Sequence, residues 1–222
     1  MKVYHGSERI IQVPIFGMGK AYNDYGLGFY CTESEEMARE WAVEKERDGY
    51  ANIYELNSSE LCTLNLNSDE FCILHWLAVL LENRYFDTTS LIAAEAKEYL
   101  LDQYHVNYKE YDVIRGYRAD DSYFSFAQDF LNNTISIRQL NHAMQLGNLG
   151  EQVVLKSKKA FENIKYQGFL LAERKIWYPK KKERDEKARE DYFDSRKNKR
   201  KKEDLFISQI IDGRITGDDL RI

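Results

Sequence analysis

The residues best suited to chemistry lie near the amino terminus, in two short motifs that both contain glycine. The first motif is His5-Gly6-Ser7, and the second contains Gly28 and Tyr30. An imidazole and a hydroxyl group can hydrogen-bond the hydroxyls of a sugar, and glycine lets a ligand approach the backbone closely. A tyrosine ring offers a face on which a planar group can stack. The two motifs therefore predict a cleft for a sugar-bearing ligand with a planar ring.

Trp41 is a second aromatic candidate for the same cleft. It lies about two turns along a helix that we expect over residues 34–42, after the strand that carries Tyr30. This spacing would let both rings flank a planar ligand. Core packing explains Trp41 equally well, and a strand that ends in a turn is the structural alternative for His5.

The third candidate element is the pair Glu151 and Gln152, which starts a strand expected over residues 151–155. A carboxylate there can bond a ribose hydroxyl and stabilise a cation that forms at the sugar, whereas a glutamine brings no charge. Adjacent strand residues point to opposite faces of a sheet, so only one of the two side chains can enter the cleft. The structural alternative is that Glu151 and Gln152 have no role in a site and simply form the exposed, polar first residues of a buried strand.

Other clusters of functional residue types carry weaker signals. Gly26 and Gly28 lack the third glycine and the helix start of a dinucleotide-binding fingerprint. No histidine has companions at metal-ligand spacing, so we expect no metal. The cysteines are odd in number and also lack such spacing. We interpret them as reduced thiols of a cytoplasmic protein: Cys31, Cys62 and Cys72.

The composition describes a globular chain with a charge-rich surface. Of its 222 residues, 43% are hydrophobic and 31% are charged, which excludes wholesale disorder. A formal net charge of −5 argues against binding nucleic acid over the whole surface, although a local basic patch is compatible with it. The apolar run over residues 71–81 is shorter than a membrane span and predicts a buried helix.

The pattern along the chain predicts an α+β fold with a charged extension. We expect strands over residues 1–5, 28–32, 50–56, 62–66, 111–116 and 151–155, and helices over 34–42, 69–104 with a break near 87–90, 123–131 and 136–144. Beyond this region the segment 179–204 is mostly charged and predicts a solvated helix or extended arm. The expected domains are therefore 1–172 and a charged helical extension over 173–222.

The order of these motifs resembles the histidine-tyrosine-glutamate branch of the ADP-ribosyltransferase superfamily. More narrowly, the chain is similar to the bacterial family catalogued as domain of unknown function 3990 (DUF3990). That resemblance covers about residues 1–170 and extends through Asp112-Val113-Ile114, Ala119-Asp120-Asp121 and the segment 152–160. It implies an ADP-ribosyltransferase-like split β-sheet core with flanking helices, with the charged arm outside it.

The resemblance also implies roles for the first motifs, with NAD as the substrate. His5 would bond a ribose hydroxyl, the Gly6 backbone would hold the nicotinamide carboxamide, and Ser7 would add a hydroxyl contact. Tyr30, after Gly28, and Trp41 would stack on the two faces of the nicotinamide ring. Ala38 stands where the polymerases of this branch carry a serine, so we expect that contact to be missing.

The resemblance leaves the third position open. Spacing against the polymerase strand aligns Glu151 with the catalytic glutamate, whereas the narrower bacterial family uses a glutamine, which matches Gln152. If Glu151 faces the cleft, a transferase with the usual machinery follows. If Gln152 does, simple mono-ADP-ribosylation is still chemically feasible, but chain elongation is not expected.

The implied function is an NAD-dependent mono-ADP-ribosyltransferase that modifies a protein or nucleic-acid acceptor and releases nicotinamide. Small bacterial enzymes of this kind resemble toxins or phage-defence effectors of the cytoplasm, held in check by an antitoxin protein, with no membrane partner. The alternative is a catalytically silent NAD-sensing or partner-binding module that has kept the pocket without the chemistry.

Overall fold

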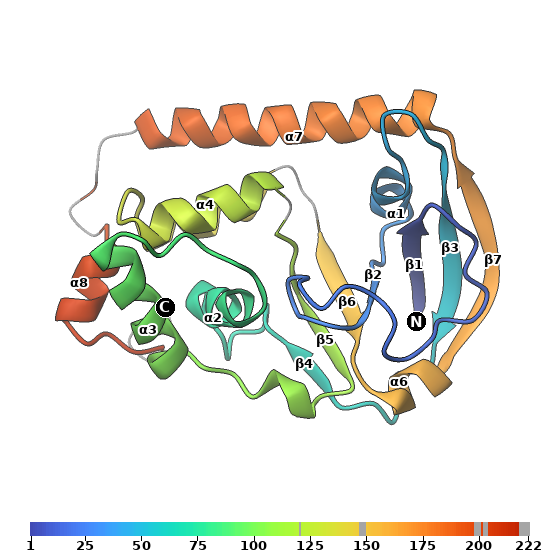
Figure 1. Cartoon of the computed structure of the whole chain (residues 1–222), viewed down its shortest axis with the longest axis horizontal. Coiled ribbons are helices and arrows are strands. Elements are labelled where there is room, and N and C mark those ends of the chain that lie inside the picture. Colours follow the sequence, from blue (N-terminus) through green and yellow to red (C-terminus); the bar gives the residue numbers. More distant parts are fainter. Residues whose placement is uncertain (120, 147–149, 198–200, 202–203, 218–222) are drawn as a thin grey trace.

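The computed structural model describes residues 1–119, 121–146, 150–197, 201 and 204–217, and over these residues the chain is a mixed α+β protein with two β-sheets. The first sheet has the order β1 (Lys2–Ser7), β3 (Gly49–Leu56), β7 (Ile164–Ala172), and all its neighbours are antiparallel. The second has the order β2 (Phe29–Cys31), β6 (Glu151–Leu155), β5 (Val113–Tyr117), β4 (Thr63–Asn65). Figure 1 shows the two sheets side by side, with most of the helices beyond the second sheet, on the side away from the first.

A pair of backbone hydrogen bonds joins the two sheets where the first two strands meet. The Tyr4 amide donates to the Thr32 carbonyl at 2.8 Å, and the Thr32 amide donates back to the Tyr4 carbonyl at 2.9 Å. This bridge sets β1 beside the end of β2. It therefore brings the two glycine-containing motifs of the amino-terminal region together.

Most of the helices build a large core on the side of the second sheet away from β1. Their bounds are α1 (Glu35–Ala42), α2 (Ile73–Asn83), α3 (Leu91–Gln103), α4 (Asp121–Leu131), α5 (Ile137–Ala143), α6 (Lys158–Glu162), α7 (Arg174–Lys197) and α8 (Ile207–Asp212), with a 3₁₀ turn over Tyr108–Glu110. Helix α2 is buried almost throughout, and Trp76 and Leu77 lie at the centre of this core. This confirms the buried helix predicted from the apolar run.

Local sequence signals account well for where most helices begin. The Ser34 hydroxyl accepts from the Met37 amide at the start of α1, and Glu35 and Glu36 occupy the first turn, where the helix dipole favours negative charge. Ser90 caps α3 in the same way, which confirms the predicted break in the helical stretch. Strand β7 and helix α6 were not expected, because Ile164–Ala172 lacks a clean alternation of apolar and polar residues.

Helix α1 lies unusually close to the first sheet because two strand residues have no side chain. A Cβ atom at Gly6 would lie 2.1 Å from the Ala38 carbonyl oxygen, and one at Gly49 would lie 2.0 Å from that of Ala42. Neither position can hold a larger residue unless the helix moves. This close contact sets the position of α1, and of Trp41 on it, relative to β1.

The charged segment forms the long helix α7, which contacts both α1 and α4 and spans the upper edge of the molecule in Figure 1. Near its start, Trp177 and Tyr178 pack on Ala42 and its neighbours. Near its end, the buried Tyr192 ring stacks on Phe126 at a centroid distance of 3.8 Å. Of the two forms predicted for this segment, the structure has the helix.

Among the residues that the structure describes, no helix is both long enough and apolar enough to cross a membrane.

We predict that Gly6→Ala destabilises the protein by about 1–3 kcal/mol or more, because the added methyl group overlaps the backbone of α1. Urea unfolding followed by circular dichroism measures this change. Gly17→Ala is the control, because a Cβ atom at position 17 meets no atom within 4 Å. The φ of Gly17 is +82°, so any loss of stability in this variant comes from the backbone conformation and not from a steric overlap. Equal stability of Gly6→Ala and the wild type would contradict the proposed close contact.

Candidate functional site

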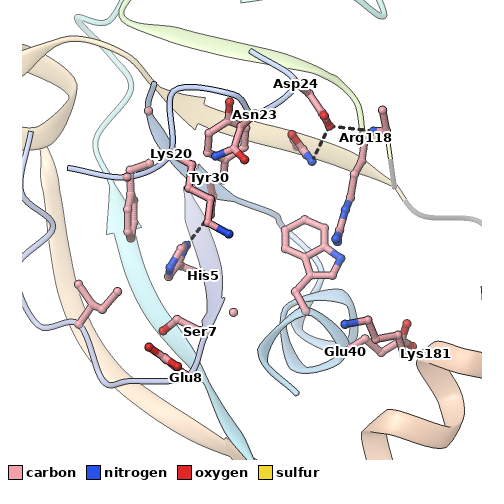
Figure 2. Close-up of a pocket in the computed structure, with 18 of the residues that line it drawn as sticks. His5, Ser7, Glu8, Lys20, Asn23, Asp24, Tyr30, Glu40, Arg118 and Lys181 are labelled. Atoms are coloured by element: carbon pink, nitrogen blue, oxygen red, sulfur yellow. Dashed lines mark hydrogen bonds between the residues drawn. The ribbon is translucent and has the colours of Figure 1, made fainter. Parts of the chain in front are cut away.

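A cleft of about 1180 Å³ opens where β1, β2, β6 and α1 meet, and the loop after β1 and helix α7 complete its walls (Figure 2). Every candidate from the sequence except Glu151 lines it: His5, Gly6, Ser7, Gly28, Tyr30, Trp41 and Gln152. These residues come from four separate segments of the chain. The tertiary structure therefore gathers them into a common site.

The His5 imidazole is held in a fixed orientation on β1. Its Nδ1 atom lies 2.6 Å from the Tyr30 carbonyl oxygen, and its ring stacks on Phe29 at a centroid distance of 4.3 Å (Figure 2). A carbonyl oxygen can only accept, so Nδ1 carries the proton. Burial lowers the pKa of His5, although the hydrogen bond to Tyr30 opposes this shift. A neutral ring with Nδ1 protonated leaves Nε2 as a hydrogen-bond acceptor.

The Ser7 hydroxyl is engaged with the loop that follows β1. It donates to the Arg9 carbonyl at 2.5 Å and accepts from the Asn52 amide at 3.0 Å. Asn52 is fully buried and also accepts from the Ile11 amide at 2.8 Å. Sequence reasoning missed Asn52, because a single asparagine within an apolar strand gives no pattern to detect.

The two aromatic candidates are fixed in different ways. The Tyr30 hydroxyl donates to the Gly26 carbonyl at 2.5 Å and accepts from the Tyr25 amide at 3.1 Å, and burial raises its pKa. Trp41 is half-buried, and the Arg118 guanidinium lies over its ring, 4.0 Å from the centroid. Its Nε1 atom has no hydrogen-bond partner among the described residues. One face of Trp41 is thus already occupied by a cation.

The two candidate glycines of the cleft, Gly6 and Gly28, are required by packing, whereas the sequence suggested that they let a ligand approach the backbone. Gly6 faces the backbone of α1, as described above. At Gly28, a Cβ atom would lie 2.7 Å from Cγ1 of Val154 on β6. Ala38 is fully buried under the first sheet.

The neighbours Glu151 and Gln152 point to opposite sides of β6, as strand geometry requires. Gln152 is 6% exposed and lines the cleft. Glu151 lies outside the cleft and accepts from Asn67 at 2.9 Å and from Arg115 at 2.8 Å. Burial would raise the pKa of Glu151, but the hydrogen bonds from Asn67 and Arg115 outweigh it and lower this pKa. Of the two residues, Gln152 is therefore the one that lies in the same cleft as His5.

Asp24 is a further cleft residue that sequence reasoning missed, and it connects three other segments of the chain (Figure 2). Its carboxylate is 4% exposed and accepts from Arg84 at 2.7 Å, from the Ala119 amide at 2.8 Å and from the Gln152 amide at 3.4 Å. In the sequence it follows an asparagine and precedes a glycine-containing motif, so it resembles an ordinary loop residue. Its partners are 60 or more residues away, and no local signal reveals them.

Cationic side chains outnumber acidic ones among the residues that line the cleft, although the whole chain carries a formal net charge of −5. They come from the loop after β1, the end of α2, the loop after β5 and α7: Arg9, Lys20, Arg84, Arg118, Lys181, Lys182, Arg184 and Arg189. The acidic residues of the lining are Glu8, Asp24, Glu40 and Asp185. Arg184 forms two hydrogen bonds of 3.0 Å with the buried Glu40, which ties α7 to α1. A cleft with this charge can bind an anionic group such as a phosphate.

No group of three or more His, Cys, Asp and Glu side chains that could hold a metal ion occurs in the described part of the chain.

The fold and the site define a mixed α+β protein with a polar, partly aromatic cleft at the junction of its two sheets. Residues 1–166 match the model of a family described as protein of unknown function (DUF3990), so the chain belongs to the DUF3990 family. The match ends before α7, so the cations that α7 contributes to the cleft lie outside the matched region. No curated protein and no solved structure matches the chain.

We predict that His5 is neutral and Nδ1-protonated at pH 7, because its pKa lies below the usual value of 6.5. The unfolded chain takes up a proton near pH 6.5 whereas the folded protein resists it, so this residue lowers stability as the pH falls below about 6.5. Nitrogen-15 NMR of the imidazole reports the tautomer and the pKa. Thermal unfolding of the wild type and His5→Asn between pH 5.5 and 7.5 reports the stability. A pKa for His5 at or above 6.5 would contradict the prediction.

Proposed function

We propose that the protein is an NAD-dependent mono-ADP-ribosyltransferase with an ADP-ribosyltransferase-like split-sheet core. The observation that carries the proposal is the shared cleft of His5, Tyr30, Trp41 and Gln152, four residues from different segments. Their order and types resemble those of the histidine-tyrosine-glutamate transferases, with glutamine at the last position. The buried, oriented imidazole of His5 adds support, because a fixed Nε2 acceptor suits a ribose hydroxyl.

In this proposal each part of NAD has a region of the cleft suited to it. The nicotinamide ring stacks on Tyr30 and on the face of Trp41 away from Arg118, and the Gly6 backbone and Ser7 hydroxyl meet its polar groups. His5 accepts from a ribose hydroxyl. The diphosphate is drawn to the cationic side of the cleft, to which Arg84 and α7 contribute.

The proposed reaction breaks the bond between C1 of the ribose and the ring nitrogen of nicotinamide. The bonding electron pair leaves with nicotinamide, which becomes neutral, and an oxocarbenium-like cation forms at the ribose. A nucleophilic atom of the acceptor then bonds to C1 and gives up a proton to solvent. Gln152 carries no negative charge to stabilise the cation, so the acceptor must supply part of the driving force, and transfer of single ADP-ribose units follows.

The acceptor in this proposal is a protein or a nucleic acid, and the biological setting is a bacterial toxin or phage-defence effector. We expect such an enzyme to act in the cytoplasm under the control of an antitoxin protein. These elements of the proposal rest on the resemblance of the chain to ADP-ribosyltransferases.

A second candidate function is a catalytically silent module that binds NAD without consuming it. The observation in its favour is the orientation of β6, which turns the Glu151 carboxylate out of the cleft and puts the Gln152 amide into it. Such a protein would keep the stacking and hydroxyl contacts and lack the negative charge that favours nicotinamide departure.

The test is incubation of the purified protein with NAD labelled in its adenosine part and with bacterial lysate. We expect label on a macromolecule and release of nicotinamide. His5→Ala, Trp41→Ala and Gln152→Ala should each lower kcat/KM at least about tenfold, since each removes one contact to the donor. Glu151→Gln is the matched control, adjacent in sequence but outside the cleft, and it should keep kcat/KM within about twofold.

Three other outcomes would each redirect the proposal. NAD binding without nicotinamide release or transfer of label supports the silent module. Loss of activity in Glu151→Gln but not in Gln152→Ala contradicts the assigned cleft geometry. Failure of the wild type to bind NAD at millimolar concentration, measured by the change in its tryptophan fluorescence, removes both candidate functions.

A further inference from the structure

The amide oxygen of Gln152 is a buried acceptor that its own protein leaves unused. The side chain is 6% exposed, and its Nε2 atom donates to Asp24, whereas Oε1 has no hydrogen-bond partner in the described part of the chain. Buried polar atoms are satisfied in most folded proteins, and an exception requires an explanation. Because Gln152 lines the cleft, a bound ligand that carries a hydrogen-bond donor would be the partner of this oxygen.

Asp24 determines which end of the Gln152 amide faces that ligand. A carboxylate can only accept hydrogen bonds, so the amide NH2 must turn toward Oδ2 of Asp24, 3.4 Å away. Turning the amide over would place two oxygen atoms against each other. Asp24 is itself fixed, because Arg84 donates to Oδ1 and the Ala119 amide donates to Oδ2.

We propose that Asp24 is a positioning residue that aims the Gln152 amide oxygen into the cleft, where it accepts a hydrogen bond from a hydroxyl group of the ligand. The identification of that hydroxyl as one on the ribose next to nicotinamide rests on the proposed function. The orientation of the amide does not rest on the proposed function, because it follows from the contacts of Asp24.

The same arrangement explains why a glutamine occupies this position. A glutamate at position 152 would hold its carboxylate about as far from Asp24 as the amide nitrogen lies now, 3.4 Å. Two carboxylates at that distance repel each other, and one must take up a proton. Arg84 forms an ion pair with Asp24, and an amide at position 152 adds no second negative charge beside that pair.

The principal test compares two probes, NAD and free nicotinamide, on the variant Asp24→Asn. The variant removes the negative charge that holds the Gln152 NH2 group and leaves one acceptor oxygen for the donors of Arg84, Ala119 and Gln152. The amide is then no longer held with its oxygen toward the cleft. We expect the affinity for NAD to fall about fivefold, the loss of one hydrogen bond, and the affinity for nicotinamide, which has no ribose, to stay within about twofold. Glu151→Gln, outside the cleft, should change neither affinity.

A merely structural role for Asp24 predicts a different pattern, in which both probes weaken together because the whole cleft is disturbed. That result, or unchanged NAD affinity in a folded Asp24→Asn variant, overturns the proposal. If the wild type binds neither probe, the proposed function fails, and the orientation of the amide is decided by the next measurement.

NMR on the wild-type protein tests the orientation without any ligand or any substitution of Asp24. The side-chain NH2 signal of Gln152 is identified by its disappearance in Gln152→Leu. We expect its protons to exchange with water at least about tenfold more slowly than those of the exposed Gln103, because they are buried and bonded to Asp24. Exchange as fast as that of Gln103 overturns the proposal.

A coupling experiment covers the case in which Asp24→Asn folds poorly. Gln152→Glu should lower the melting temperature of the wild type at pH 7.5, since it creates a pair of adjacent carboxylates. The same substitution in the Asp24→Asn background should cause a smaller loss. Equal losses in the two backgrounds would mean that the residues do not interact, and would overturn the proposal.

Discussion

The arrangement of the cleft depends on the close approach of helix α1 to the first sheet. Gly6 and Gly49 leave no side chain between the strands and the helix, so the backbone of α1 lies directly against β1 and β3. His5 precedes Gly6 on the strand, and Trp41 lies on the helix face that meets it. The Tyr4–Thr32 bridge adds β2 and Tyr30 to the same place. A change in the distance between helix and sheet would therefore alter the whole aromatic side of the cleft.

The polar side of the cleft depends on the register of β6 between β2 and β5. Val154 pairs with Tyr30 and with Ile114, and this register puts Gln152 on the cleft side and Glu151 on the other. Glu151 then binds Arg115, and Gln152 binds Asp24. Two side chains of similar size thus acquire different environments, one beside a cation and one beside a carboxylate. Their chemical types, acid and amide, match these environments.

Helix α7 links the two halves of the molecule around the cleft. It packs on the first sheet and α1 through Trp177 and on the helical core through Tyr192, and Arg184 ties it to the buried Glu40. Its cations line a cleft whose other residues belong to the region that matches the DUF3990 family. The carboxy-terminal part of the chain thus forms part of the site and packs on the family region, in addition to following it in sequence.

The sequence alone determined much of the local structure: the buried helix at Leu77, the break in the helical stretch near Ser90 and the strand that begins at Glu151. It also indicated the candidate residues, because motifs such as His5-Gly6-Ser7 are contiguous. Periodicity and capping can be recognised in this way since they depend on neighbours along the chain. Only the tertiary structure decided which of Glu151 and Gln152 enters the cleft and joined Asp24 to Arg84, because strand register and long-range ion pairs depend on residues far apart in sequence.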